Sequence, residues 1–324
     1  LRWCTEPITY GNKNILLVVY ILTFLIGFPA NMVAFYTFSK KVRQKAIPID
    51  VLLLNLTISD IIFLLVLPFK MKEAADNMKW YLPDFLCPLT NFVFYTTIYN
   101  STFFLTAISV ERYLGVAFPI QYKLKRRPLY AMVASFFFWT ISMAHVSIVY
   151  IMQYLHQSNT SQTELGRCYE NFTQEQMVVL MPVRLELFLF LFCCPFLICC
   201  FCYINFVQIL SQRPNISQKK RLRAIGLSLG TLLVFVVCFA PFNLSHVVGF
   251  IKWESPSWRV EAVLSSTINA CLDPIIFYFS SSALSGTFHH FLKSFVERVQ
   301  QLCGPCKALN SRSQDSPPNS NDSL

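Results

Sequence analysis

Charged residues are scarce in this chain of 324 amino acids, and their scarcity excludes an ordinary soluble domain. Asp, Glu, Lys and Arg together make up 14% of the sequence, whereas soluble proteins average roughly 25%. Glycine is also rare, with nine residues, and no Gly-rich loop that could cradle a phosphate occurs. We find no pattern of a catalytic triad either. These absences predict that the chain is not an enzyme.

Apolar residues dominate instead, at 54% of the chain with 31 Phe. Seven apolar stretches are long enough for a membrane helix, which needs about 20 residues. They cover residues 14–39, 49–73, 85–116, 128–152, 177–209, 224–251 and 258–281. We therefore predict an all-α integral membrane protein, with a bundle of seven transmembrane helices over residues 14–281. The two halves show no matching broken stretches, which would have favoured a transporter.

The basic residues predict the orientation of this bundle. A net charge of +10 could indicate nucleic-acid binding, but the cations are not gathered into one domain. They cluster after the first, third and fifth stretches, at Lys40–Lys41, Arg126–Arg127 and Lys219–Lys220. The positive-inside rule places those loops in the cytoplasm and residues 1–13 outside the cell. We expect a multi-pass plasma-membrane protein without a nucleic-acid partner, whose first stretch acts as signal anchor because no cleavable signal peptide precedes it.

The C-terminal region divides into two parts. Residues 282–300 place Phe288, Phe291, Leu292 and Phe295 on one helical face, which predicts an amphipathic helix lying on membrane lipid. Residues 301–324 are polar and rich in Ser, Pro and Asn, and we expect a disordered cytoplasmic tail. Its pair Cys303 and Cys306 has redox-motif spacing, but no βαβ setting surrounds it. We therefore predict S-palmitoylation of these cysteines.

Two covalent features follow from the predicted topology. Cys87 begins the third stretch and Cys168 lies in the second extracellular loop, where oxidising conditions favour a disulfide between them. Asn159 and Asn171 are the sequons of that same loop and are predicted glycosylation sites. The other sequons fall in membrane stretches or, at Asn215, in the cytoplasm, and topology eliminates them.

An arginine inside the fifth stretch is the strongest sign of function, because ionisable groups in a membrane are costly. Glu186 cannot neutralise Arg184, since residues two apart face different sides of a helix. His246 and Arg259 lie at a similar depth on the next two stretches. Three potential cations at one depth favour a bound anion. The alternatives are that Arg184 snorkels to the surface and pairs with Glu170, and that His246 is a neutral packing residue.

The ordered motifs resemble those of rhodopsin-like G-protein-coupled receptors. They are Asn31, "LNLTISD" ending at Asp60, Cys87, Glu111-Arg112-Tyr113, Trp139, Cys238-Phe239-Ala240-Pro241 and Asn269 with Asp273-Pro274-Ile275-Ile276-Phe277. Phe239 stands where Trp is frequent in this family, and Asp273 and Phe277 replace its usual Asn and Tyr. The resemblance implies heterotrimeric G proteins and arrestin as partners.

The same resemblance assigns roles at two further places. Glu111, Arg112 and Tyr113 would couple to the G protein, with a Glu111–Arg112 ion pair in the resting state. The second place is a sodium site, formed by Asp60, Ser101, Asn269 and Asp273. A proton shared between the two aspartates is the structural alternative.

A closer resemblance is to the short-chain free fatty acid receptors, through "ERYLGVAFPIQYKLKRRPLY", "CYENFT", "PVRLEL", "NLSHVVGF" and "SPSWR". It implies activation by acetate, propionate or butyrate, through inhibitory or phospholipase-linked G proteins. The residues that it implies for the ligand are Arg184, Arg259 and His246 on the carboxylate, Tyr95 and Tyr99 as walls and Glu170 as a lid. Tyr95 and Tyr99 share a helical face, so aromatic packing is their alternative role. Phe242 replaces a pocket tyrosine of that group. A receptor for another small anion and a carboxylate transporter remain alternative functions.

Overall fold

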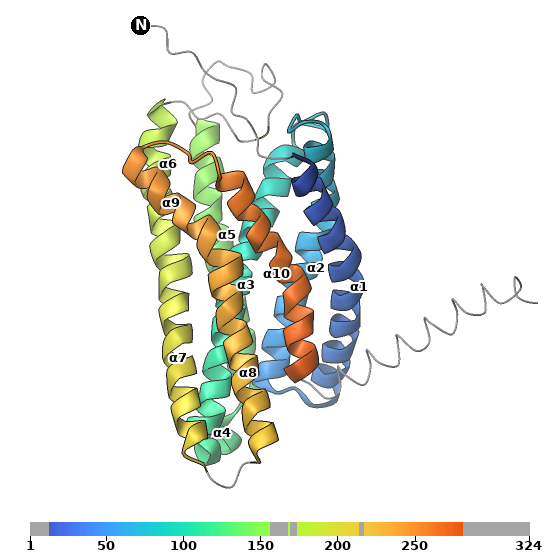
Figure 1. Cartoon of the computed structure of the whole chain (residues 1–324), viewed down its shortest axis with the longest axis vertical. Coiled ribbons are helices and arrows are strands. Elements are labelled where there is room, and N and C mark those ends of the chain that lie inside the picture. Colours follow the sequence, from blue (N-terminus) through green and yellow to red (C-terminus); the bar gives the residue numbers. More distant parts are fainter. Residues whose placement is uncertain (1–12, 156–167, 169–173, 214–216, 281–324) are drawn as a thin grey trace, which may run out of the picture.

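The computed structural model describes residues 13–155, 168, 174–213 and 217–280, and all their regular elements are helical (Figure 1). In chain order the elements are α1 (Lys13–Lys45), α2 (Pro48–Ala75), α3 (Leu86–Ala117), α4 (Pro119–Lys125), α5 (Pro128–Leu155), α6 (Gln174–Glu186), the π-helical segment η2 (Leu187–Cys193), α7 (Cys194–Ser211), α8 (Gln218–Val234), the π-helical segment η3 (Phe235–Phe239), α9 (Ala240–Lys252) and α10 (Arg259–Ser280).

The helices form one bundle along a common long axis, as Figure 1 shows. Six helical stretches among the described residues are long and apolar enough to cross a membrane. The pair α3 and α4, bent by 118° at its junction, makes a seventh candidate. The prediction of an all-helical membrane protein is thus confirmed, with six to seven candidate spans. The predicted helix over 282–300 and the tail with Cys303 and Cys306 lie outside the described residues.

Helix α3 is more polar than its neighbours because it packs in the interior of the bundle. It contacts α2, α5 and α7, and its buried residues include many Thr and Asn beside Phe94 and Phe104. Thr102 shows how such residues are accommodated: its hydroxyl contacts the carbonyls of Tyr99 and Leu191, at 2.7 and 3.0 Å. A helix that contacts protein on most sides does not need a lipid-facing apolar surface.

A close approach joins the first helix to the last. The Asn31 side-chain amide donates to the carbonyl of Ala270 in α10 at 2.8 Å. One turn earlier, a Cβ on Gly27 would lie 3.3 Å from the same carbonyl oxygen and 3.3 Å from the Leu64 side chain. A larger residue at Gly27 would therefore separate α1 from α10, which carries part of the site described below.

Two of the long apolar stretches are interrupted by π-helical turns, which the sequence pattern did not predict. η2 separates α6 from α7, and η3 separates α8 from α9. Such segments are frequent at functional sites. Each added residue rotates the preceding side chains by about 100° relative to a continuous helix. The π turns therefore help to decide which way Arg184 and His246 point.

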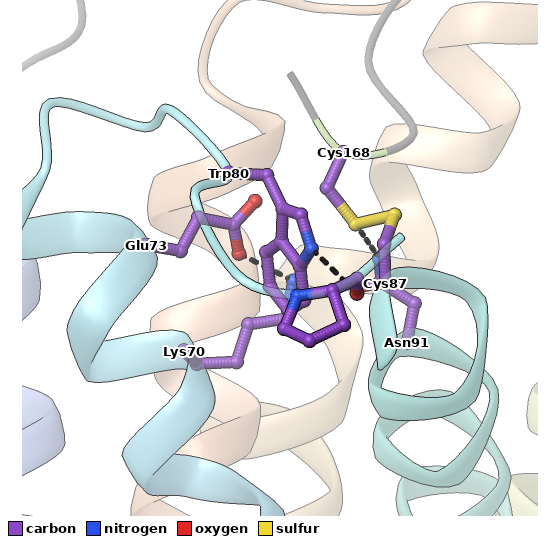
Figure 2. The surroundings of a disulfide bond; sticks show 7 residues. Lys70, Glu73, Trp80, Cys87, Asn91 and Cys168 are labelled. Carbon is purple, nitrogen blue, oxygen red and sulfur yellow. Dashed lines mark hydrogen bonds and ion pairs between the residues drawn. A yellow bond between two sulfur atoms is a disulfide. The ribbon is translucent and has the colours of Figure 1, made fainter. Parts of the chain in front are cut away.

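The predicted disulfide is present and marks one end of the bundle. Cys87 and Cys168 are bonded across 81 positions of sequence, and the Asn91 amide donates to the Cys168 sulfur at 3.0 Å (Figure 2). Nearby, the Lys70 ammonium lies 2.8 Å from a Glu73 carboxylate oxygen. We call this the disulfide end. The structure describes Cys168 but not the residues beside it in the loop, so Asn159, Asn171 and Glu170 lie outside the described part of the chain.

Candidate functional site

A cavity of about 80 Å³ lies between the helices near the disulfide end. Its walls come from α3, α5, α6, η2, α9 and α10. The lining residues are Tyr95, Tyr99, Val146, Val149, Tyr150, Arg184, Leu187, Phe242, His246 and Arg259. The structure thus brings together every residue of the predicted carboxylate site that it describes. Sequence reasoning missed the apolar wall from α5, because nothing in a uniformly apolar helix distinguishes one valine from another.

His246 stands at the centre of a hydrogen-bond chain in this cavity. Arg259 Nη1 lies 3.2 Å from His246 Nδ1, and His246 Nε2 lies 3.1 Å from the Tyr99 hydroxyl. A guanidinium only donates, so Nδ1 must accept. The imidazole is then neutral and its proton sits on Nε2, which donates to the Tyr99 oxygen. His246 therefore acts as a neutral hydrogen-bonded group here, and not as a third cation.

This order of donors leaves the Tyr99 hydroxyl proton available to the cavity. The Tyr99 oxygen accepts from His246, so its own O–H is free to donate to a further acceptor. Tyr99 and His246 are both 1% exposed. A ligand oxygen is an acceptor of the required kind.

Arg259 is fixed by three neighbours. Its Nη1 also donates to the Ser245 hydroxyl at 3.0 Å, and its guanidinium lies 4.8 Å from the centre of the Phe242 ring. Phe242 in turn stacks on Tyr95 with ring centres 5.6 Å apart. The cation–π contact and the two hydrogen bonds orient the guanidinium plane before any ligand binds.

Arg184 reaches the cavity from α6 and is 7% exposed. Its Nη1 donates to the Ser255 hydroxyl at 2.7 Å, in the link between α9 and α10. Glu186 points elsewhere: its carboxylate lies 3.0 Å from His145 Nε2 on α5. The expectation that Arg184 and Glu186 face different sides is therefore confirmed. Glu170, the alternative partner of Arg184, lies outside the described residues.

The electrostatics of the cavity favour an anion. Two guanidinium groups, those of Arg184 and Arg259, line it and repel each other. Within the described part of the chain, no carboxylate lines this cavity. Two cations that line one cavity of low dielectric constant are stabilised by an anion placed between them.

The size of the cavity limits that anion. A water-sized group occupies about 10–15 Å³ on this measure, so 80 Å³ holds roughly five to eight heavy atoms. A carboxylate group takes three of these positions, which leaves about two to five for carbon atoms. Val146, Val149 and Leu187 provide apolar walls for them.

The residues predicted to bind sodium lie deeper in the bundle. Asp60, Ser101 and Asn269 line a second cavity of about 10 Å³, and Asn269 donates to Asp273 at 2.9 Å. Buried oxygens of Asp60, Asn269 and Asp273 are without a hydrogen-bond partner. Such hard oxygen donors fit a small cation, and the space fits one ion or one water. A proton shared by the two aspartates also fits, because their carboxyl groups lie against each other.

At the opposite end of the bundle, the Glu-Arg-Tyr motif contacts three different elements. Tyr122 of α4 donates to the Glu111 carboxylate at 2.5 Å. Arg112 donates to the Leu227 carbonyl and the Thr231 hydroxyl of α8, both at 3.4 Å. Tyr113 packs against an aromatic ring of α7. Glu111 and Arg112 thus each contact a residue on a separate helix, and the expected ion pair between the two side chains stays a prediction.

Comparison with known proteins matches residues 30–277 to the family described as 7 transmembrane receptor (rhodopsin family). Free fatty acid receptor 3 of Mus musculus is 48% identical over 304 residues, which cover 93% of this chain and 95% of that protein. Free fatty acid receptor 2 of Mus musculus is 53% identical over 279 residues, covering 86% and 84%. Free fatty acid receptor 1 of Macaca fascicularis is 31% identical over 269 residues, covering 80% and 88%. From the motifs we expected the greatest similarity to receptor 2; over the whole chain, receptors 2 and 3 are about equally similar.

Proposed function

Because the chain belongs to the rhodopsin family of seven-transmembrane receptors, and within it to the free fatty acid receptors, we propose that it is a plasma-membrane receptor for short-chain carboxylates that activates heterotrimeric G proteins. The family consists of receptors, which agrees with the prediction that the chain is not an enzyme. Acetate, propionate and butyrate are the proposed ligands.

The observation that carries this proposal is the pair of guanidinium groups on one small cavity with apolar walls. Each guanidinium offers two parallel N–H groups to a carboxylate, a geometry that a lysine does not reproduce. In the proposed complex, Arg184 and Arg259 hold the two carboxylate oxygens, and Tyr99 donates its free O–H to one of them. The alkyl tail lies against Val146 and Val149.

The ligand's size limits its affinity. Acetate has four heavy atoms, and a ceiling of about −1.5 kcal/mol per atom gives roughly −6 kcal/mol, a dissociation constant of tens of micromolar at best. Such a receptor responds to acids that are present at high micromolar to millimolar concentrations. A scarce hormone of this size would not occupy it.

For transmission of the signal, we place the disulfide end outside the cell and Arg112 at the cytoplasmic side. The α8–η3–α9 stretch joins the two ends: it carries His246 at the cavity and Thr231 at Arg112. A movement of α9 toward a bound carboxylate would shift α8 and release Arg112 to the G protein. Coupling to inhibitory or phospholipase-linked G proteins and binding of arrestin belong to the same proposal.

Several further features remain part of the proposal. They are the sodium ion at Asp60, Ser101, Asn269 and Asp273, the glycosylation of Asn159 and Asn171, the palmitoylation of Cys303 and Cys306, the lid role of Glu170 and the membrane-surface helix over 282–300. A sodium ion would supply positive charge between the two aspartates, which would otherwise share a proton.

The test is a guanine-nucleotide exchange assay on membranes that contain the protein, with acids from acetate to dodecanoate. We expect acetate, propionate and butyrate to activate exchange, and octanoate and longer acids to fail because the cavity has no room for them. Propionamide is the matched neutral control and should be inactive. If amides act like acids, the anion site is wrong. Uptake of labelled propionate without exchange would favour the transporter alternative, and activation only by other anions the second receptor alternative.

A further inference from the structure

The short link between α9 and α10 contacts both arginines of the cavity. Ser255, in the middle of the link, accepts a hydrogen bond from Arg184 Nη1 at 2.7 Å. Arg259 follows at the end of the link, as the first residue of α10. The segment of six residues 253–258 therefore accepts a hydrogen bond from Arg184 and leads directly into Arg259.

The link itself is held in place by its own backbone and by close packing. Trp253 ends α9 in the left-handed conformation, with φ 53°, and the Glu254 N–H donates to the Gly249 carbonyl at 3.2 Å. This is the hydrogen-bond pattern of the Schellman motif, which is common at the C-terminal ends of helices. A Cβ on Gly249 would lie 3.3 Å from the Glu254 carbonyl oxygen and 3.6 Å from atoms of Met181 and Pro256. The link thus packs directly on α9 and α6.

From this geometry we propose that Ser255 is a positioning residue for the carboxylate site: it holds the Arg184 guanidinium in the orientation that binds the ligand. The inference rests on the function proposed above. A guanidinium has five N–H donors, so a hydrogen bond to Ser255 does not exclude a further hydrogen bond to a carboxylate. Ser255 therefore assists the ligand without competing with it.

The benefit is preorganisation. A free arginine side chain occupies many rotamers, and ordering it when the ligand arrives would reduce affinity. Ser255 fixes the side chain beforehand, as Ser245 does for Arg259 through its 3.0 Å hydrogen bond. Two serines, one in α9 and one in the link, thus orient the two guanidinium groups.

The first test compares Ser255→Ala, Ser255→Thr and Ser257→Ala at matched surface expression. Ser257 is exposed in the same link and is the control. We expect Ser255→Ala to raise the half-effective concentration at least about tenfold, the lower end of the range for one hydrogen bond to a charged group. The factor should be equal for acetate and butyrate, because Ser255 acts on the carboxylate end. Ser255→Thr keeps the hydroxyl and should stay near the parent, as should Ser257→Ala.

Two comparisons separate positioning from a general structural effect. In an Arg184→Ala background, adding Ser255→Ala should cause no further loss, because the hydroxyl then has no guanidinium to hold. Val149→Ala, on the tail wall, should instead change the ratio of the butyrate and acetate responses. If Ser255→Ala also weakens the response in the Arg184→Ala background, the inference is wrong. It is also wrong if Ser255→Ala lowers the half-effective concentration, because Ser255 would then compete with the ligand for Arg184.

A measurement without ligand keeps the inference distinguishable from the proposed function. Hydrogen–deuterium exchange of the purified receptor should show faster exchange of segment 253–258 in both Ser255→Ala and Arg184→Ala, and parent-like exchange in Ser257→Ala. If the parent shows no response to any short acid, the proposed function fails, whatever the exchange data show. If the parent responds and Ser255→Ala matches it in both assays, the positioning role alone is wrong.

Discussion

Arg259→Lys should weaken the carboxylate response strongly although it keeps the positive charge. The parent guanidinium donates to Ser245 and His246 and stacks on Phe242 at the same time. A lysine ammonium has no planar fork and cannot reproduce this set of contacts together with a carboxylate. One lost hydrogen bond to a charged group costs about 1.5–3 kcal/mol.

A second loss follows through the imidazole. Without the Arg259 donor, His246 is free to move its proton to Nδ1, and its Nε2 then accepts from the Tyr99 hydroxyl. That O–H is no longer available to the ligand. With at least about 1.5 kcal/mol for each of the two losses, the combined loss is at least about 3 kcal/mol, which raises the half-effective concentration at least about 150-fold. Acetate, limited to roughly −6 kcal/mol in the parent, would then need millimolar or higher concentrations.

The assay is guanine-nucleotide exchange over an acetate and propionate titration, at matched surface expression. Lys79→Ala is the control, because Lys79 is an exposed cation near the same end of the bundle. Its screened charge should change the response by no more than about twofold. A parent-like response of Arg259→Lys would refute the fork geometry. If Arg259→Ala also responds like the parent, Arg259 does not hold the ligand at all.

Three further predictions concern other parts of the bundle. Cys87→Ser or Cys168→Ser should lower surface expression and thermal stability, since loss of a disulfide typically costs about 2–5 kcal/mol; unchanged melting of both variants would contradict this. Arg112→Ala should abolish nucleotide exchange and leave labelled-propionate binding intact, because Arg112 lies at the end of the bundle opposite the cavity. If the variant retains exchange, Arg112 has no part in the mechanism. His145→Leu or Glu186→Leu should each reduce stability by about 1 kcal/mol by leaving a polar partner unpaired, and the double variant should recover most of it; additive losses would show that the pair is not coupled.

The sequence predicts the composition of the site better than its geometry. Arg184 and Arg259 are recognisable because charge is rare in apolar stretches and because helix length places them at one depth. Their partners Ser245 and Ser255 are not recognisable, since serines are common and these contacts depend on the path of the α9–α10 link. That path depends in turn on the left-handed backbone of Trp253, a residue with no preference for it.

The fold, like the site, can be predicted from the sequence only in part. Hydropathy locates the helices, but not the π turns η2 and η3, which replace the expected continuous helices. Likewise, the Glu-Arg-Tyr motif can be recognised in the sequence. The contacts of Glu111 with Tyr122 and of Arg112 with Thr231 join different helices, and no local sequence pattern predicts them.

Arg184 and Glu186, at the end of α6, have different surroundings although they are only two positions apart. A snorkelling arginine would extend toward the membrane surface and stay hydrated, yet Arg184 is 7% exposed and lines the cavity between the helices. Its obvious counter-ion, Glu186, is only two positions away but is held by His145 on the other face of the helix. That contact keeps the Glu186 carboxylate out of the cavity, whose lining includes the guanidinium groups of Arg184 and Arg259. A carboxylate supplied from outside can neutralise them, and a small apolar-walled space admits one that is short.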